Sequence, residues 1–504
     1  IEFSSQVRSC ISQSKLMGNK IPNESEQQNY PLIQSTPSQP QFQPNTDSLI
    51  QQTCSESNKL WHIAAPSIFS RLTMFSITVV TQSFAGHLND LDLAAISISC
   101  TLLISITFGF LLGMASALET LCGQAYGAGQ NHMLGVYLQR SWVVLFLSSI
   151  LLLPMFVFAT PMLKFIGQPV EVAEQAGLVA IWLIPFHLSF PFQFTLQRFL
   201  QCQLKTGIIA WVSGGALVIH VILSWVFVYK MRVGIVGIAL TIDFSWWVSV
   251  LGMLCYTLFG GCSCSWTGFS VEAFVGLWDF FKLSLASGVM LALENFYYRL
   301  LLIMSGYMYN SDVAIDALSV CVTIYGWESM IPLGFLAATG VRVANELGAG
   351  NAKGAKFATM VSVVNTVLVG FVFWLIIVTF NEKLALIFTS SLSVIQMVHE
   401  LSFLLAFTIL LNCVQPVLSG VAVGSGRQVV VAYINIGSYY LVGIPFGILL
   451  GWLLPSGIVG MWIGMMSGTV VQTLILAIIT SRYDWEREVR KAQILVKDDE
   501  TSNQ

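Results

Sequence analysis

The stretch VSVVNTVLVGFVFWLIIVTF, residues 361–380, carries no charged side chain and is long enough to cross a bilayer as one helix. Residues 145–162 form a second stretch of this kind, and further apolar runs fill most of the chain. Only 10% of the 504 residues are charged, whereas a soluble domain carries roughly 25%. Such a chain hides most of its surface from water, so the sequence predicts an all-α membrane protein.

Twelve transmembrane helices are expected, separated by short loops with the Gly, Pro and Asn residues typical of turns. The expected spans are residues 60–84, 93–119, 136–161, 172–192, 207–229, 234–259, 276–306, 313–340, 355–380, 391–412, 428–453 and 457–481. The expected domains are an N-terminal tail (1–58), an N-terminal lobe with spans one to six (59–260), a cytoplasmic inter-lobe loop (261–275), a C-terminal lobe with spans seven to twelve (276–481) and a C-terminal tail (482–504).

Both tails differ from the spans in composition. Residues 1–58 are rich in Gln, Ser, Pro and Asn and cannot bury enough apolar area to offset their ordering entropy, so a disordered tail is expected. After Arg482 the chain is charged, and Trp485 and Val489 predict the start of an amphipathic helix. Lys and Arg residues gather in the loops of one side, which places both termini in the cytoplasm. Arg427, at a helix start on that side, is interpreted as a solvated or lipid-facing charge.

The two halves of the chain contain a repeated segment. LGMASALETLCGQAYGAG, residues 112–129, aligns without gaps on LGFLAATGVRVANELGAG, residues 333–350, and both copies end the second span of their half. Because each repeat contains six spans, the repeats share one topology and are related by an axis along the membrane normal. The sequence therefore predicts two pseudo-symmetric lobes that flank a cavity, which is typical of transporters.

The same segments resemble a known family. ETLCGQAYGAG (119–129), RVANELGAGN (342–351) and QPVLSGVAVGSG (415–426) look like the signatures of MATE transporters, the multidrug and toxic compound extrusion family. The plant DETOXIFICATION branch is the most similar, in particular the transparent-testa type of flavonoid/proton antiporter. The resemblance covers residues 60–485, which is everything but the tails.

This resemblance implies a V-shaped pair of six-helix lobes, alternating access, and export or sequestration of small organic solutes by proton antiport. Flavonoid glycosides, alkaloids and xenobiotics are the solute classes it suggests. It also implies a monomer without a cofactor other than the coupling proton, in the vacuolar membrane or, as the alternative, the plasma membrane.

Glu294 lies in the middle of the seventh expected span. A charge at the centre of a transmembrane helix costs about 2.5–3.5 kcal/mol and is therefore an indication of function. Low-dielectric surroundings disfavour an ionised carboxyl, so one proton gained or lost there can bias two conformations. Tyr298, four residues on, lies on the same face of the helix. The alternative is a buried glutamate held in an ion pair; in the family, the glutamate of this seventh-span motif is implicated in proton coupling.

One position departs from the family pattern. Many plant members have an aspartate three residues before the Gln of QPVLSG, where this chain has Asn412. Asparagine forms hydrogen bonds but carries no proton, so proton coupling is expected to rest on Glu294. The residues expected to line the substrate cavity are Tyr298, Asn412, Gln415, Glu328, Tyr325 and Arg71. For Arg71 a purely structural role stays open.

The repeated segments also predict a set of gating or structural residues. These residues lie at the ends of spans, beside glycine-rich turns, where they are expected to hinge or lock each lobe. They are Glu119, Gly123, Gln124, Arg342, Asn345 and Glu346. Arg342 and Glu346 are four residues apart, so a local ion pair is possible between them.

Other classes of function are disfavoured. The net charge of −3 suggests no nucleic-acid partner. Cys262 and Cys264 have no second pair or His cluster to complete a metal site, and no nucleophile–base pair or phosphate loop indicates an enzyme. The alternatives kept open are a lipid-linked oligosaccharide flippase of the same superfamily and a membrane receptor that does not transport.

Overall fold

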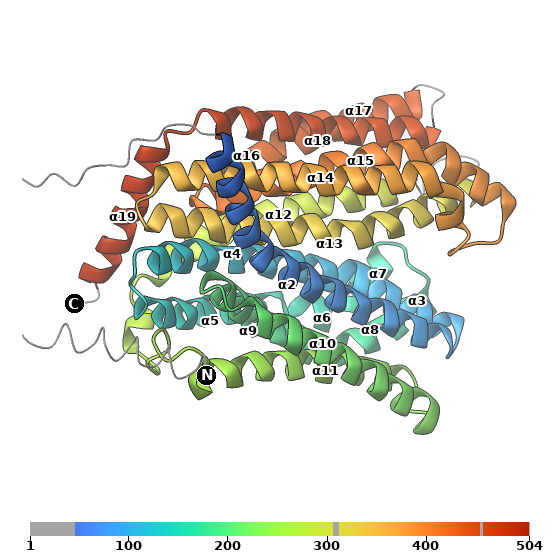
Figure 1. Ribbon diagram of the computed structural model, residues 1–504. Helices are drawn as coiled ribbons and strands as arrows, with labels where there is room; N and C mark the ends of the chain where they lie inside the picture. Colours follow the sequence, from blue (N-terminus) through green and yellow to red (C-terminus); the bar gives the residue numbers. More distant parts are fainter. Residues whose placement is uncertain (1–45, 306–311, 454–456, 503–504) are drawn as a thin grey trace, which may run out of the picture. The chain divides into compact units, whose positions relative to one another are not determined.

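The computed structural model describes residues 46–305, 312–453 and 457–502. The chain divides after Cys54, and the unit that begins at Ser55 contains the bundle discussed below. The helices are α2 (Thr46–Gly86), α3 (Asp90–Ile98), α4 (Ser105–Gly127), α5 (Met133–Leu152), α6 (Pro154–Val157), α7 (Ala159–Phe165), α8 (Val170–Trp182), α9 (Ile184–Cys202), α10 (Thr206–Trp225), α11 (Ile235–Tyr256), α12 (Leu277–Ser305), α13 (Asp312–Gly348), α14 (Ala352–Ala385), α15 (Leu392–Gly424), α16 (Gln428–Asn435), α17 (Ile444–Ile448), α18 (Gly457–Ser481) and α19 (Trp485–Ser502) (Figure 1). Short π-helical segments continue several of them, namely η1 (Ser99–Ile104), η2 (Val226–Lys230), η3 (Thr257–Gly261), η5 (Ile436–Gly443) and η6 (Leu449–Leu453), while η4 (Val271–Phe274) is a 3-10 turn.

The expected fold class is confirmed. Within the described ranges the chain contains helices and no strand. Ten helical segments there are long and apolar enough to cross a membrane, and α8 with α9, bent by 48°, forms an eleventh. Helix α12, 29 residues long, occupies the place of the seventh expected span. Each of the twelve spans predicted from the sequence therefore corresponds to one helix or to a run of consecutive helical segments.

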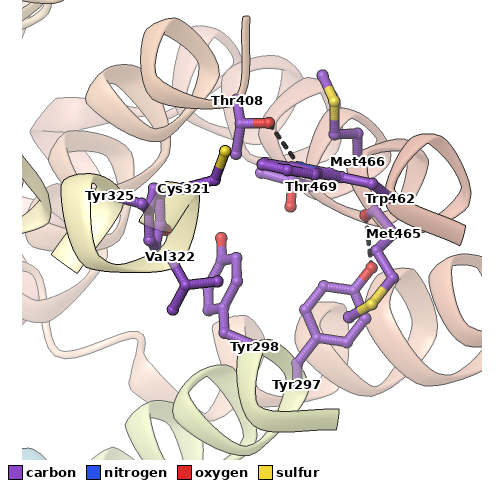
Figure 2. Close-up of a pocket in the computed structure, with 10 residues that line it drawn as sticks. All are labelled: Tyr297, Tyr298, Cys321, Val322, Tyr325, Thr408, Trp462, Met465, Met466 and Thr469. Carbon is purple, nitrogen blue, oxygen red and sulfur yellow. Dashed lines mark hydrogen bonds between the residues drawn. The ribbon is translucent and has the colours of Figure 1, made fainter. Parts of the chain in front are cut away.

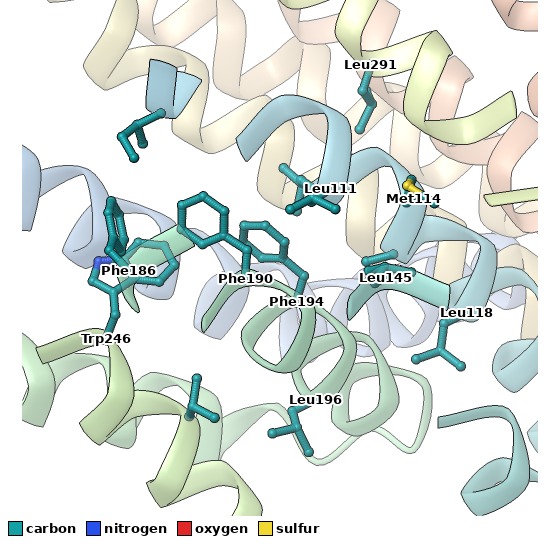
Figure 3. Close-up of a cluster of buried hydrophobic side chains, with 14 of the residues drawn as sticks. Leu111, Met114, Leu118, Leu145, Phe186, Phe190, Phe194, Leu196, Trp246 and Leu291 are labelled. Atoms are coloured by element: carbon teal, nitrogen blue, oxygen red, sulfur yellow. The ribbon is translucent and has the colours of Figure 1, made fainter. Parts of the chain in front are cut away.

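The first half of the bundle packs around an aromatic cluster (Figure 3). Phe186, Phe190 and Phe194 follow each other at four-residue intervals, so they share one face of α9. Trp246 of α11 closes the cluster, with its ring centroid 4.8 Å from that of Phe186 and 5.3 Å from that of Phe190. Offset and edge-to-face contacts of this kind stabilise aromatic cores. The cluster holds α9 and α11 in fixed positions beside α4.

The N-terminal part of α2 differs from expectation. Residues 1–45 of the expected tail lie outside the described residues, but α2 begins at Thr46, so residues 46–58 are helical rather than disordered. The buried Glu56 accepts a hydrogen bond of 2.8 Å from Arg342, and Ser57 donates one of 3.0 Å to Asn365. Composition alone could not predict this helix, because its partners lie about 290 residues further along the chain.

The expected amphipathic helix after Arg482 is present as α19. Its buried side chains recur every three or four residues, which places them on one face. The apolar ones are Trp485, Val489, Ala492 and Val496, and the first three pack with Val343, Leu347, Ala352, Ala355 and Val421. Helix α19 therefore covers the ends of α13, α14 and α15 (Figure 1).

The sequence suggests a solvated or lipid-facing charge at Arg427, but its side chain, 28% exposed, is ion-paired. Its guanidinium binds both carboxylate oxygens of Glu488 in α19, with Nε 3.1 Å from Oε2, and lies over the ring of Tyr483 at 4.5 Å. Burial opposes ionisation of Glu488, but Arg427 and Lys491 outweigh it and hold the pKa of Glu488 below its usual range. A helix that docks from a distant part of the sequence supplies the counter-charge.

Replacing Arg427 with alanine should release α19. Glu488, only 2% exposed, would lose its bidentate partner, at a cost of about 1–3 kcal/mol. A cysteine introduced at the buried Ala492 should then react several-fold faster with a membrane-impermeant maleimide. The measurement uses a protein in which the exposed Cys54 and Cys255 are replaced by serine.

Lys491→Ala is the matched control, because Lys491 also pairs with Glu488, at 3.3 Å, but is half exposed. Its effect on the labelling rate should be small, since exposed ion pairs contribute little. Equal labelling rates in the Arg427→Ala variant and the parent protein would contradict the role given to this contact.

Candidate functional site

A cavity lies in the second half of the bundle, among α12, α13, α15 and α18 (Figure 2). It encloses about 520 Å³ of space not filled by atoms, including its open side. Its walls are aromatic and apolar, with a few hydroxyl and sulfur groups. The lining residues are Tyr297, Tyr298, Cys321, Val322, Tyr325, Thr408, Trp462, Met465, Met466 and Thr469.

Hydrogen bonds fix the walls of this cavity. The indole of Trp462 donates to the hydroxyl of Thr408 at 3.0 Å, and the hydroxyl of Tyr297 donates to the carbonyl of Met465 at 2.5 Å. The Tyr298 ring points into the cavity in Figure 2, with its centroid 5.7 Å from that of Tyr325. Rigid aromatic walls with few polar groups suit a flat organic ligand.

Glu294 borders this cavity from α12, one turn before Tyr298. Its side chain is 9% exposed, and its Oε2 has no hydrogen-bond partner among the described residues. Gln415 of α15, whose amide donates to Ser419 at 3.1 Å, is a polar neighbour of Glu294, and Tyr298, Tyr325 and Tyr439 lie close enough to interact with its charge. A carboxyl with one oxygen unpaired in an apolar site is a group that can hold a proton.

A second buried carboxyl, Glu328, lies on α13. Its Oε1 accepts a hydrogen bond of 3.5 Å from the thiol of Cys413, and its Oε2 has no partner in the described part of the chain. Proline follows four residues later in α13, at Pro332, and likewise in α15, where Pro416 follows Asn412. Because proline has no N–H, the carbonyls of Glu328 and Asn412 lose their helical hydrogen bonds. Unpaired backbone groups in a membrane are tolerated where they line a cavity.

The structure brings most of the expected cavity residues together. Tyr298 and Tyr325 line the cavity, while Glu294, Glu328 and Gln415 border it. Asn412 is buried on α15, in the same part of the bundle. Arg71 lies elsewhere, on α2 in the first half.

The cavity residues expected from the sequence do not include Thr408 of α15 or Trp462 and Thr469 of α18. One pattern in the sequence does indicate an aromatic site in the second half of the chain. Two tyrosine pairs, at residues 297–298 and 439–440, lie in its apolar spans. The rings of Tyr297 and Tyr439 stack at 4.2 Å, so the pairs meet at this cavity.

The repeated segments meet at the other functional feature, the ends of α4 and α13. A Cβ atom on Gly123 would lie 2.5 Å from the Cβ of Ala344, and these two residues match in the repeat alignment. A Cβ on Gly127 would overlap the carbonyl oxygen of Asn345, and one on Gly348 would overlap that of Gln124. Each contact is repeated with the halves exchanged, as across a twofold axis. We call the C-terminal ends of α4, α9, α13 and α15, which meet here, the glycine-rich end.

Two side-chain amides at equivalent positions of the repeat each form a hydrogen bond to the opposite half. Gln124 donates to the carbonyl of Gly424, the last residue of α15, at 3.0 Å. Asn345, its counterpart, donates to the carbonyl of Cys202, the last residue of α9, at 3.4 Å. The last carbonyls of a helix have no partner within it, so each half satisfies a helix end of the other.

Ion pairs surround these contacts. Arg198 of α9 pairs with Glu119 of α4 at 2.7 Å, and both side chains are at most 3% exposed. Arg342 pairs with Glu346 at 2.5 Å and with Glu56 at 2.7 Å. The expected gating residues therefore lie together at the glycine-rich end, around the axis that relates the halves.

Away from the glycine-rich end, the central helices change from fully buried to partly exposed. On α13, residues 334–345 are all buried, whereas residues 322–331 are partly exposed except Glu328. On α4, residues 111–125 are all buried. We use the name inter-lobe cleft for the partly exposed region along residues 322–331 of α13.

A known protein family matches the chain in two segments, one in each half. The family model described as MatE matches residues 66–226 and residues 286–449, one segment in each half. The chain belongs to the MATE family. The family expected from the signature segments is thus confirmed, and the protein is a multi-pass membrane transporter.

Relatives extend this assignment over most of the chain. Protein DETOXIFICATION 27 of Arabidopsis thaliana is 58% identical over 438 residues, 87% of this chain and 90% of the relative. Protein DETOXIFICATION 26 of the same plant is 55% identical, over 88% and 91% of the two chains. The crystal structure of the eukaryotic MATE transporter AtDTX14 superimposes with a TM-score of 0.84 at 35% identity, covering 88% of this chain and 99% of that one. The MATE chain described here is of the plant detoxification type.

Gly348→Ala should destabilise the protein. The added methyl group would collide with the backbone carbonyl of Gln124, which cannot move without shifting α4. Overpacking of this kind costs about 1–3 kcal/mol. The melting temperature of the purified protein in detergent, followed by tryptophan fluorescence, should fall by several degrees.

Gly215→Ala is the matched control, because a methyl group there meets no atom within 4 Å. Both changes raise helix propensity equally, so only the close approach differs. Identical melting temperatures for the two variants would show that the contact at Gly348 contributes nothing.

Proposed function

We propose that this MATE transporter exports small organic solutes in exchange for protons, and that Glu294 carries the proton. The observation that supports it is the buried Glu294 carboxyl, with one oxygen unpaired beside a tyrosine-lined cavity. Asn412 cannot take a proton, whereas Glu294, whose charge acts on Tyr298 in the cavity wall, can respond to a pH gradient.

The proposed cycle uses two protonation states of one group. Ionised Glu294 keeps its site hydrated and favours the solute-bound state. A proton that enters from the acidic side neutralises the carboxyl, removes the cost of burying its charge, and favours solute release and closure of the cavity. Exposure to the cytoplasm then removes the proton. The two conformations differ in their affinity for one proton, which is the condition for coupling.

The glycine-rich end faces the cytoplasm in this proposal, together with both termini. Arg198, Arg342 and Arg427 lie there with α19, as the positive-inside rule favours. The described conformation is then closed toward the cytoplasm. Glu119, Gly123, Gln124, Arg342, Asn345 and Glu346 act as the gate that must open for solute to enter. Flavonoid glycosides, alkaloids and xenobiotics are the proposed cargo, moved by a monomer in the vacuolar membrane or the plasma membrane, without a cofactor.

Transport into proteoliposomes tests this function. With vesicles acidic inside, the wild-type protein should accumulate a flavonoid glucoside or an alkaloid, and collapsing the gradient with an ionophore should stop it. Glu294→Gln should reduce gradient-driven uptake at least about tenfold, because the group that exchanges protons is gone.

Glu382→Gln is the control, since it removes one carboxylate from an exposed position, 69% exposed. It should transport like the wild type. Uptake that persists without a gradient would exclude proton exchange, and full coupling in Glu294→Gln would move the proton to another residue.

A further inference from the structure

Arg71 of α2 stands on the boundary between the two halves. Ile68, one turn before it, packs against Gly334 of α13, and Phe75, one turn after it, contacts Trp327 with ring centroids 5.0 Å apart. Residues three and four apart share a face of a helix, so Arg71 faces α13 as well. Its side chain is partly exposed, at the level where α13 changes from buried to partly exposed. Arg71 therefore lies at the floor of the inter-lobe cleft.

The charges at this floor are unbalanced. Behind Arg71 lies the buried pair of Arg198 and Glu119, close enough for both charges to act on Arg71. Among the described residues, Arg71 forms no hydrogen bond and no ion pair of its own. Two guanidinium groups share one carboxylate, so one positive charge is left without a counter-ion.

Within the described ranges, no ion pair joins Glu294 or Glu328 to Arg71. Glu294 interacts with Gln415, and Glu328 with Cys413, both in the second half. The carboxylate of Glu119 cannot turn toward Arg71, because it is ion-paired with Arg198 and packs directly against Gly340. A cation in low-dielectric surroundings is stabilised by an anion that reaches it from the cleft.

We propose that Arg71 is a binding residue for the anionic group of the transported solute, with Arg198 and Glu119 as its positioning residues. The ligand class is a flat aromatic compound that carries a carboxylate. A guanidinium binds a carboxylate with two parallel hydrogen bonds. Phe75 and Trp327, one helical turn along the cleft, are placed to contact the aromatic part. This inference deepens the proposed function by naming a substrate class, and binding to Arg71 requires no proton gradient.

A matched pair of ligands tests the site. 4-Methylumbelliferyl glucuronide and 4-methylumbelliferyl glucoside share a planar ring and a sugar, and they differ by one carboxylate. Titration calorimetry on the full-length protein in detergent should show that the wild type binds the glucuronide roughly tenfold or more tightly than the glucoside. Arg71→Gln should abolish this preference and leave glucoside binding unchanged. Arg71→Lys should retain part of the preference, because it keeps the charge but not the fork of donors.

Lys164→Gln is the control, since it removes a cation that is 38% exposed and paired with Glu174. It should retain the full preference for the glucuronide. The proposal is overturned if the wild type binds both compounds equally or if Arg71→Gln keeps the preference. It is also overturned if Arg71→Gln weakens both compounds alike, since the role of Arg71 is then structural. Failure of proton exchange would leave these binding results intact, so the two proposals fail separately.

Discussion

The close approach of α4 and α13, where glycine on one helix meets backbone on the other, is the contact on which the bundle depends. In a membrane the hydrophobic effect does not drive helices together, so small residues that permit close packing decide where helices meet. Gly127 and Gly348 provide this twice, with the halves exchanged. A second pair of contacts related in this way lies further from the glycine-rich end. There Gly113 of α4 packs on the backbone of α12, and Gly334 of α13 packs on the backbone of α2. The central pair thus fixes the first helix of the opposite half on each side.

The polar groups inside the bundle are distributed unequally between the halves. Glu294 and Glu328 lie with the tyrosines of the second half, whereas the first half holds Arg71 beside the Arg198–Glu119 pair and, on α11, the buried Asp243. Among the described residues, a solute in the cleft therefore meets one unpaired cation on the side of α2 and acidic, aromatic surroundings on the other. Since low dielectric strengthens both fields, the orientation of a bound solute is determined by its own charge distribution.

Hydropathy predicted the twelve spans, and the internal repeat predicted two halves of one topology, because both depend on patterns that are local or repeated. The direct contact between the signature segments was not predicted. The start of α2 and the environment of Arg427 could not be predicted, since Glu56 and Arg427 find their partners about 290 and 61 residues away. For the cavity, the sequence indicated the residues that are costly in a membrane, such as Glu294. Trp462 and Thr408 are ordinary residues of apolar spans, and only the packing of α15 against α18 gives them a role.

Glu119 and Gly340 occupy matching positions in the repeat, and the carboxylate of one lies against the backbone of the other. If both repeats had glutamate at this position, two carboxylates would lie at the same site on the axis. They would repel each other, and their side chains would overlap. A homodimer of the first half could not close in this way. Joining the halves in one polypeptide allows one copy to lose the side chain and the other to keep its acid. The symmetry of this transporter is therefore broken by necessity at its centre, and neither half can substitute for the other.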